Sequence, residues 1–337
     1  MIENTLMISL DIGGTAATGI ALHLPGSSAV KLSCPSRNLR TMSPDDLADL
    51  AKSLSAQIEA GGGRADGAVW LIGGAGARPD ADRERWGEAM KRIGLDAAEI
   101  VFSRDYEANH AAAFGGEEGI LSVNGTGSVL FGRRGGMDRR RGGWGFLLDT
   151  TPSGAEFGRL ALQQVLGAIE GDITGKSILA GFKKQFRHLQ IDRAALLDWL
   201  YADPAAQRRL GELAPVLTLA VDEGDLTAEA LVSASLRRWA ADVRALAAEL
   251  GFGNKISMAG IGGLWTNWKQ FSERALAVLS DREPGRFSLR EPAFHPAWGP
   301  LLRYLSSSAR GIDDEMLHQL RFLAERVEQF HVPSEES

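Results

Sequence analysis

The chain has 337 residues, 44% of them hydrophobic and 24% charged, with a formal net charge of −6. This length suits two domains of roughly 100 to 200 residues each. The acidic balance argues against general nucleic-acid binding, and no apolar run approaches the roughly 20 residues that a membrane helix needs. Because no secretory signal is recognised either, we expect a cytoplasmic protein without nucleic-acid or membrane partners.

Cysteine and histidine usage excludes the common metal sites. The one cysteine, Cys34, cannot form a disulfide within the chain or supply a structural zinc site built on thiolates. The six histidines show no metal-ligand spacing. A transition-metal centre is therefore not expected.

The first predicted elements are three strands in a meander, over residues 6–10, 19–23 and 29–33. The first strand leads directly into the run Asp11–Thr15. Its glycines let the main chain approach an anion, Thr15 adds a hydroxyl donor, and Asp11 can hold a hydrated magnesium ion. The run therefore predicts a phosphate contact, although a purely steric turn would have the same pattern.

Helices and strands then alternate, which predicts a mixed sheet flanked by helices. A helix capped by Ser43 runs to about residue 60, and a strand over 68–72, a helix over 79–93 and a strand over 99–102 follow. The last strand feeds Asp105, at the start of an alanine-rich helix. Asp105 is either an N-cap or, beside a phosphate loop, a carboxylate that orients an acceptor hydroxyl and accepts its proton.

A second glycine turn lies between two strands within residues 119–132 and reads Gly125-Thr126-Gly127-Ser128. A hairpin does not need two hydroxyls in order to turn, so we interpret it as a second phosphate loop. The basic run 133–141 is interpreted mainly as a solvated hairpin, with an anion contact as the lesser alternative. The order of strands from residue 119 repeats that of the opening, which indicates a duplicated architecture without a sequence repeat.

The C-terminal half is predicted to be mainly helical from residue 152 to 250, before a strand over 256–259, a glycine turn over 260–263 and a helix from Trp265. The chain then ends in an amphipathic helix with acids in its first turn and a frayed segment, residues 331–337. Two apolar stripes are expected in the core: Val232, Leu236, Trp239, Val243, Leu246 and Leu250, and then Ile312, Met316, Leu320, Leu323, Val327 and Phe330.

The first glycine run, the segment around Asp105 and the second glycine run resemble, in this order, the nucleotide-binding signature of the sugar kinase, heat-shock ATPase and actin superfamily. More narrowly, they resemble the N-acetylglucosamine kinase and BadF/BadG/BcrA/BcrD-type ATPase family. The stretches Gly142–Leu148 and Ser257–Leu264 fit this narrower group.

The resemblance implies an α/β, two-lobed ribonuclease H-like (actin-like ATPase) fold with an ATP cleft between the lobes. Each lobe would be a mixed β-sheet flanked by helices. The N-terminal lobe would comprise residues 1–117 with the C-terminal helix 311–331, and the C-terminal lobe residues 118–310 with a helical insertion over 152–250.

The resemblance also implies an ATP-dependent kinase that phosphorylates an amino sugar, such as N-acetylglucosamine or glucosamine, or a related hexose. ATP and Mg²⁺ would be the cofactors, and a homodimer is expected. Asp11 would serve the metal and Asp105 would be the base. The phosphates would contact Gly13, Gly14, Thr15, Gly125, Thr126, Gly127 and Ser128, adenosine would contact Gly262 and Gly263, and the sugar would contact Asn38, Asp105, Thr126, Gly143, Trp144 and Asp149.

The chain departs from the family where a Gly-Asp-Glu-Gly-Ser run usually grips the sugar hydroxyls. Thr150 and Thr151 stand in place of the acids, and Asp149 is one position early. A neutral hydrogen bond contributes about 1 kcal/mol, against about 1.5 to 3 for one to a charged group. Either Asp149 substitutes, or the substrate differs, or the protein is an inactive sugar or nucleotide sensor. An ATPase is a further alternative, without the iron–sulfur cluster of the activating ATPases, because that cluster takes two cysteines from each subunit.

Overall fold

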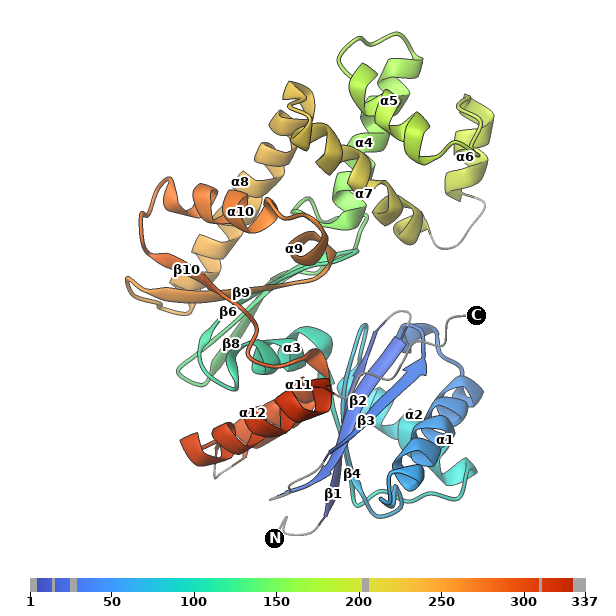
Figure 1. Ribbon diagram of the computed structural model, residues 1–337, viewed down its shortest axis with the longest axis vertical. Coiled ribbons are helices and arrows are strands. Elements are labelled where there is room, and N and C mark those ends of the chain that lie inside the picture. Colours follow the sequence, from blue (N-terminus) through green and yellow to red (C-terminus); the bar gives the residue numbers. More distant parts are fainter. Residues whose placement is uncertain (1–4, 14–15, 25–28, 202–205, 309–310, 330–337) are drawn as a thin grey trace. The chain divides into compact units, whose positions relative to one another are not determined.

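The structure is a computed structural model that describes residues 5–13, 16–24, 29–201, 206–308 and 311–329. The chain divides into two compact units, unit 1 with residues 1–117 and 292–337, and unit 2 with residues 118–291 (Figure 1). The chain returns to unit 1 at Pro292, whereas the sequence placed the return at residue 311. Buried hydrogen bonds explain the earlier return, because the Ser9 hydroxyl donates to the carbonyl of Ala297 and accepts from the N–H of Leu301.

Unit 1 is built on a five-stranded sheet in the order β3-β2-β1-β4-β5. The first three strands form the predicted antiparallel meander, and β1, β4 and β5 are parallel. Consecutive residues of β1 are buried because helices cover both faces of the sheet. The strands are β1 (Leu6–Ile12), β2 (Ala16–His23), β3 (Ala29–Pro35), β4 (Val69–Gly74) and β5 (Glu99–Arg104).

Helices α1 (Pro44–Ala60) and α2 (Pro79–Arg92) cover one face of this sheet (Figure 1). Helices α3 (Asp105–Phe114), α11 (Gly299–Ser307) and α12 (Asp314–Gln329) cover the other. The predicted start of α1 is confirmed, since the Ser43 hydroxyl accepts from the Asp46 N–H and the Asp46 carboxylate accepts from the Ser43 N–H. Short 3₁₀ helices, η1 (Leu39–Thr41) and η2 (Pro296–Trp298), complete the unit.

Unit 2 has the order β10-β9-β6-β7-β8, with the same pairing directions as unit 1. The predicted duplication of architecture is therefore confirmed. The basic run forms the predicted hairpin, whose turn residues Gly135 and Gly136 have positive φ angles of 57° and 75°. The strands are β6 (Gly119–Asn124), β7 (Ser128–Arg134), β8 (Met137–Gly142), β9 (Ile256–Ile261) and β10 (Phe287–Arg290).

A helical insertion separates β8 from β9, as predicted. The stripe along α8 is buried from Val232 to Leu250, and it shares a core with Ile120 and Met258 of the sheet. The insertion consists of α4 (Gly154–Ile169), α5 (Lys176–Gln185), α6 (Arg193–Tyr201), α7 (Ala206–Asp222) and α8 (Leu226–Glu249).

Two features of unit 2 differ from the sequence expectation. The helix predicted from Trp265 is two helices, α9 (Gly263–Asn267) and α10 (Phe271–Ser280). They are separated because Trp268 is buried and its indole N–H donates to Asp222, 46 residues away. Strand β10 was not predicted, because its four residues include a serine and an arginine and are too few to show a strand pattern.

The terminal helix α12 is amphipathic as predicted, with Leu320, Leu323 and Val327 buried. Phe330 and the segment 331–337, for which fraying was expected, lie outside the described residues. In the part of the chain that the structure describes, no helix combines the length and the apolar character that a membrane span requires.

Candidate active site

Three parallel strands of unit 1 bring the two candidate carboxylates to one edge of its sheet. Asp11 of β1 is paired with Gly73 of β4, and Gly73 is paired with Ser103 of β5. Asp105 follows the end of β5 directly, as the first residue of α3. Since parallel strands end at a common edge, residues 94 positions apart in the sequence meet there. The structure therefore brings Asp11 and Asp105 together.

The electrostatics of this edge disfavour two free negative charges. Burial, and then the negative charge of Asp105, raise the pKa of Asp11 to about 7. Burial also raises the pKa of Asp105, while the hydrogen bond from the Tyr106 N–H, at 2.9 Å, acts in the opposite direction. A bound cation or a proton relieves this repulsion. Mg²⁺ commonly binds one or two carboxylates together with phosphate oxygens, so the edge that holds Asp11 and Asp105 fits a magnesium ion.

Asp105 is not the N-cap of α3. Arg104 occupies that position, and its N–H donates to the Glu107 carboxylate at 3.1 Å. The capping task is thus performed by Glu107, in the manner of a capping box. The Asp105 carboxylate is consequently left with a local contact to Tyr106, and it remains suited to a chemical role.

The turn after β1 begins at Gly13, whose N–H donates to the carbonyl of Ala16 at 2.9 Å. The Ser36 hydroxyl donates to the Gly13 carbonyl, so the segment after β3 lies against this turn. Gly14 and Thr15, the other two predicted phosphate contacts of this turn, lie outside the described residues.

Asn38 stands at the start of η1, in the segment that holds Ser36. Its Oδ1 accepts from the Arg40 N–H at 3.0 Å and lies beside Gly76, where an added Cβ would be 2.6 Å from it. Gly76 follows the end of β4, so Asn38 is fixed close to the carboxyl edge of unit 1.

In unit 2, the loop Gly125–Ser128 is held by the backbone of two other segments. The N–H groups of Gly154 and Ala155 donate to the carbonyls of Gly125 and Thr126 at 2.7 and 3.0 Å. On the other side, the Gly143 N–H donates to the Ser128 carbonyl at 3.0 Å. The predicted phosphate loop and the predicted sugar contact Gly143 are therefore neighbours, although the sequence separates them by the whole β7–β8 hairpin.

The predicted adenosine turn touches the same loop. Gly262 has a φ of 103°, and a Cβ added there would lie 2.6 Å from both the Asn124 carbonyl carbon and the Gly125 nitrogen. Only glycine permits this approach of backbone to backbone. Gly263 follows as the first residue of α9. Residues 137 positions apart in the sequence are thus brought into direct contact.

Asp149 and Thr151 make their contacts within unit 2. Asp149 is 8% exposed, its carboxylate accepts from the Gly145 N–H at 3.0 Å, and burial raises its pKa. The Thr151 hydroxyl donates to the Ser128 hydroxyl at 3.0 Å. These two side chains therefore hold the loops of unit 2, whereas the indole of Trp144 is 70% exposed with the Arg140 guanidinium above its ring.

Sequence reasoning missed Asn124 and Trp265. Asn124 is fully buried, and its side chain bonds to Pro152 and to Trp265. The only signal in the sequence is an amide side chain standing directly before Gly-Thr-Gly, because both partners are remote along the chain.

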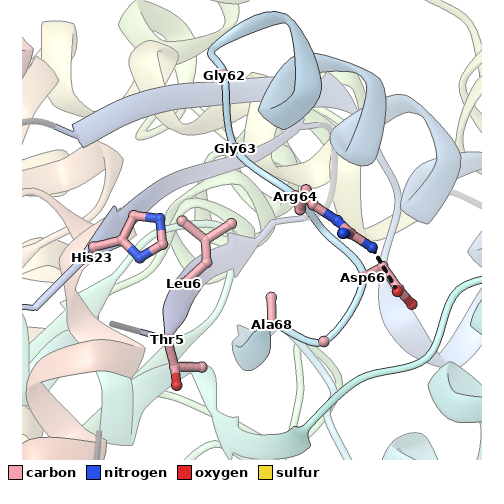
Figure 2. Close-up of a pocket in the computed structure, with 9 residues that line it drawn as sticks. Thr5, Leu6, His23, Gly62, Gly63, Arg64, Asp66 and Ala68 are labelled. Carbon is pink, nitrogen blue, oxygen red and sulfur yellow. Dashed lines mark hydrogen bonds and ion pairs between the residues drawn. The ribbon is translucent and has the colours of Figure 1, made fainter. Parts of the chain in front are cut away.

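A pocket of about 360 Å³ in unit 1 lies at the opposite end of the strands from Asp11. Figure 2 shows it lined by Leu6, His23 and Ala68, with Arg64 ion-paired to Asp66 at 3.3 Å. None of the predicted site residues lines this pocket. A second pocket, of about 380 Å³, is lined by residues between Cys34 and Ser53.

Comparison with known proteins places these features in a family. Residues 8–302 match the family described as the BadF/BadG/BcrA/BcrD ATPase family. The N-acetylmuramic acid/N-acetylglucosamine kinase of Clostridium acetobutylicum is 28% identical over 200 residues, which are 58% of this chain and 64% of that kinase. The chain thus matches slightly less than two thirds of the length of this curated relative.

Two solved structures are similar over most of the chain. They are proteins of Chromobacterium violaceum and Porphyromonas gingivalis, both described as candidate N-acetylglucosamine kinases, with identities of 23% and 19% and TM-scores of 0.66 and 0.63. Each alignment covers 89% of this chain and 98% of the other. The likeness shows the fold, and the prediction of an actin-like ATPase fold with two mixed sheets flanked by helices is confirmed.

Proposed function

Because the chain belongs to the BadF/BadG/BcrA/BcrD ATPase family, we propose that it is an ATP-dependent kinase that transfers the γ-phosphoryl group to a hydroxyl of a small sugar. The first acceptors to consider are amino sugars, N-acetylglucosamine or glucosamine, since the curated relative is a kinase of N-acetylmuramic acid and N-acetylglucosamine. The observation that carries the proposal is the contact in unit 2, where the Gly262 turn meets the Gly125 loop without room for a side chain.

In this proposal unit 2 binds the nucleotide. Gly125, Thr126, Gly127 and Ser128 supply backbone N–H groups and hydroxyls to the phosphates, and Gly262 and Gly263 flank the adenosine. Backbone N–H groups in a glycine turn form a concave anion site. The exposed Thr126 hydroxyl also contacts the sugar. In unit 1, Gly13, Gly14 and Thr15 would bind phosphate as well.

Asp105 acts on the acceptor hydroxyl. A carboxylate can orient the hydroxyl and accept its proton as transfer proceeds, and general bases work best when their pKa approaches the working pH. Burial moves the pKa of Asp105 in that direction. The raised pKa makes Asp105 a better proton acceptor than an ordinary surface aspartate.

Mg²⁺ is the second proposed cofactor, and Asp11 would hold its water shell. When bound, the metal neutralises charge on the transferring phosphoryl group. A cation bound beside Asp11 would stabilise the ionised carboxylate that burial destabilises, and would so lower its pKa from about 7.

The sugar would be held by Asn38, Gly143, Trp144 and Asp149. The exposed Trp144 indole offers an apolar face for the sugar ring. Asp149 already accepts a backbone hydrogen bond from Gly145, so in this proposal one carboxylate oxygen holds the turn and the other faces the sugar.

An inactive sensor that binds ATP or a sugar is the second candidate. The observation that favours it is the engagement of Asp149 and Thr151 inside unit 2, at the place where the family resemblance implies acids that bind the sugar. Replacing a charged hydrogen-bond partner of a sugar hydroxyl by a neutral one would weaken sugar binding by about 1 kcal/mol for each such bond.

The test measures ADP release with ATP and Mg²⁺ over a panel of glucosamine, N-acetylglucosamine, N-acetylmuramic acid, other hexoses and a control without acceptor. A kinase releases ADP only when its sugar is present. Steady release without sugar would instead show an ATPase, and ATP binding by calorimetry without any release would show a sensor. The mass of the same preparation in solution tests the homodimer, which remains a prediction.

A further inference from the structure

The side chain of Asn124 is fully buried, and all of its polar atoms are hydrogen-bonded. Its Oδ1 accepts from the Ser122 hydroxyl at 2.6 Å and from the Trp265 Nε1–H at 2.8 Å. Its Nδ2 donates to the Pro152 carbonyl at 2.6 Å and to the Ser128 hydroxyl at 3.3 Å. A buried amide with this many partners fixes the segments that supply them.

The partners of Asn124 belong to several segments around the proposed nucleotide site of unit 2. Ser128 ends the loop that Asn124 begins, Pro152 precedes helix α4, and Trp265 lies three residues beyond Gly262. One side chain therefore connects the proposed phosphate loop with the proposed adenosine turn. The backbone contact between Gly262 and Gly125 is thereby reinforced by a hydrogen bond between side chains.

The indole of Trp265 has little freedom to turn away from Asn124. Its ring lies directly against Gly260, where an added Cβ would be 2.1 Å from the Trp265 Cδ2. Phe271 and Trp239 hold it by edge-to-face contacts, with ring centroids at 4.8 and 6.5 Å. The Trp239 Nε1–H in turn donates to the Ser122 hydroxyl at 2.9 Å. The network thus extends from the site to the core of helix α8.

We propose that Asn124 and Trp265 are positioning residues for ATP, and that their hydrogen bond sets the spacing between the phosphate loop and the adenosine turn. The inference rests on the proposed kinase function, and it concerns ATP alone. A nucleotide that is bound at both ends gains affinity only when its two subsites are held at the right separation. Loss of the bond therefore weakens ATP binding without a change in the acceptor site.

The first test removes the two side chains of the bond separately. Asn124→Ala leaves the Trp265 donor and the Pro152 acceptor without partners, and Trp265→Phe removes one N–H while the ring packing is kept. We expect both variants to raise KM and Kd for ATP, by about tenfold for Asn124→Ala, the factor that one lost buried hydrogen bond produces. Because Asn124 also supports the loop that contains Thr126, KM for the sugar is compared in Trp265→Phe, where it should stay at the wild-type value.

Trp268→Phe is the matched control. Trp268 is also buried, in the same stretch of chain, and its Nε1–H donates to Asp222 at 3.0 Å, away from Asn124. The substitution deletes one indole hydrogen bond, as Trp265→Phe does. We expect a similar loss of thermal stability and no change in KM for ATP. A merely structural role for Trp265 would make the two variants alike.

The double variant Asn124→Ala/Trp265→Phe tests whether the two residues act on ATP binding through the hydrogen bond between them. If the two side chains act through one contact, the double variant should bind ATP no more weakly than Asn124→Ala. Unchanged KM for ATP in Trp265→Phe, or effects that multiply in the double variant, would overturn the inference while the kinase remained active. A wild type that does not bind ATP would overturn the proposed function, and the inference with it.

Discussion

Units 1 and 2 share one sheet topology but hold their glycine turns by different forces. Strand β6 of unit 2 corresponds to β1 of unit 1, and the residue before the turn is Ile12 in one and Asn124 in the other. Ile12 is fully buried beside Gly74, where a Cβ would be 2.2 Å from the Leu39 side chain. Asn124, in the same place, makes hydrogen bonds to four residues.

The difference teaches how one backbone can serve two purposes. In unit 1, apolar packing holds Ile12 before the turn and the Ser36 hydroxyl donates to the Gly13 carbonyl within it, while the carboxylates of Asp11 and Asp105 lie at the same edge. The hydrogen bonds of unit 2 are directional and fix the spacing of its loops. In the proposed function, acid–base and metal chemistry belong to unit 1 and nucleotide positioning to unit 2, and each prediction below tests one side of that division.

The largest effect is expected for Asp105→Asn in unit 1. The amide cannot accept the acceptor's proton, so kcat should fall by about 10² to 10⁴, while Kd for ATP remains near the wild-type value. Single-turnover assays and calorimetry measure the two quantities. Glu107→Gln is the control, because a glutamine keeps the capping bond to the Arg104 N–H; it removes a negative charge that raises the pKa of Asp105, so kcat should change far less than in Asp105→Asn. Equal kcat in Asp105→Asn and the wild type would refute the assigned role.

Much of the fold could be predicted from the sequence, because local patterns determine many of its elements. The meander, the capped helix α1, the basic hairpin and the buried stripe of α8 each follow from turn residues or apolar periodicity within one segment. Strand β10 and the interruption at Trp268 could not be predicted in this way. They depend on contacts with β9 and with Asp222, which no local pattern encodes.

The candidate site shows the same limit. The glycine runs and Asp105 are predicted from the sequence because the three segments in this order resemble a nucleotide-binding signature, whereas each segment alone also fits a steric turn or an N-cap. The partners of Asp149 and Thr151 could not be identified, since a carboxylate can bind a sugar or a neighbouring N–H equally well. Here the fold decides, by placing Gly145 and Ser128 within reach.

A smaller effect is expected for Gly262→Ala in unit 2. The new Cβ would lie 2.6 Å from backbone atoms of Asn124 and Gly125, and no side chain can move to relieve that contact. The two loops must separate, so ATP affinity should fall by at least about tenfold, or 1.4 kcal/mol, with sugar binding retained. Fluorescence or calorimetric titrations with each ligand measure this split.

Gly285→Ala is the control that separates the effect of backbone strain from the effect of disrupting the contact between the Gly262 turn and the Gly125 loop. Gly285 also has a positive φ, 72° against 103° at Gly262, in the same unit, but a Cβ added there meets nothing within 4 Å. It should cost about 1 to 2 kcal/mol of stability, from the left-handed backbone alone, and leave ATP affinity unchanged. Equal ATP affinities in the two variants would contradict the nucleotide assignment of unit 2.

The last change concerns Asp11 and appears in stability as a function of pH, not in ligand affinity or kcat. The folded-state pKa of about 7 lies above the usual value of 3.8, so between these pH values the folded protein holds a proton that the unfolded chain releases. Stability is therefore fully present below about pH 4 and is lost as the pH rises through about 7. Without metal, Asp11→Asn should remove this loss and raise the free energy of unfolding at pH 8 by a few kcal/mol, with little change at pH 4. Urea denaturation in EDTA measures it, with the exposed Asp49→Asn as control. A gain of equal size at both pH values would show that the carboxylate of Asp11 does not carry the penalty, and the contrast between a charged edge in unit 1 and a neutral loop in unit 2 would fail.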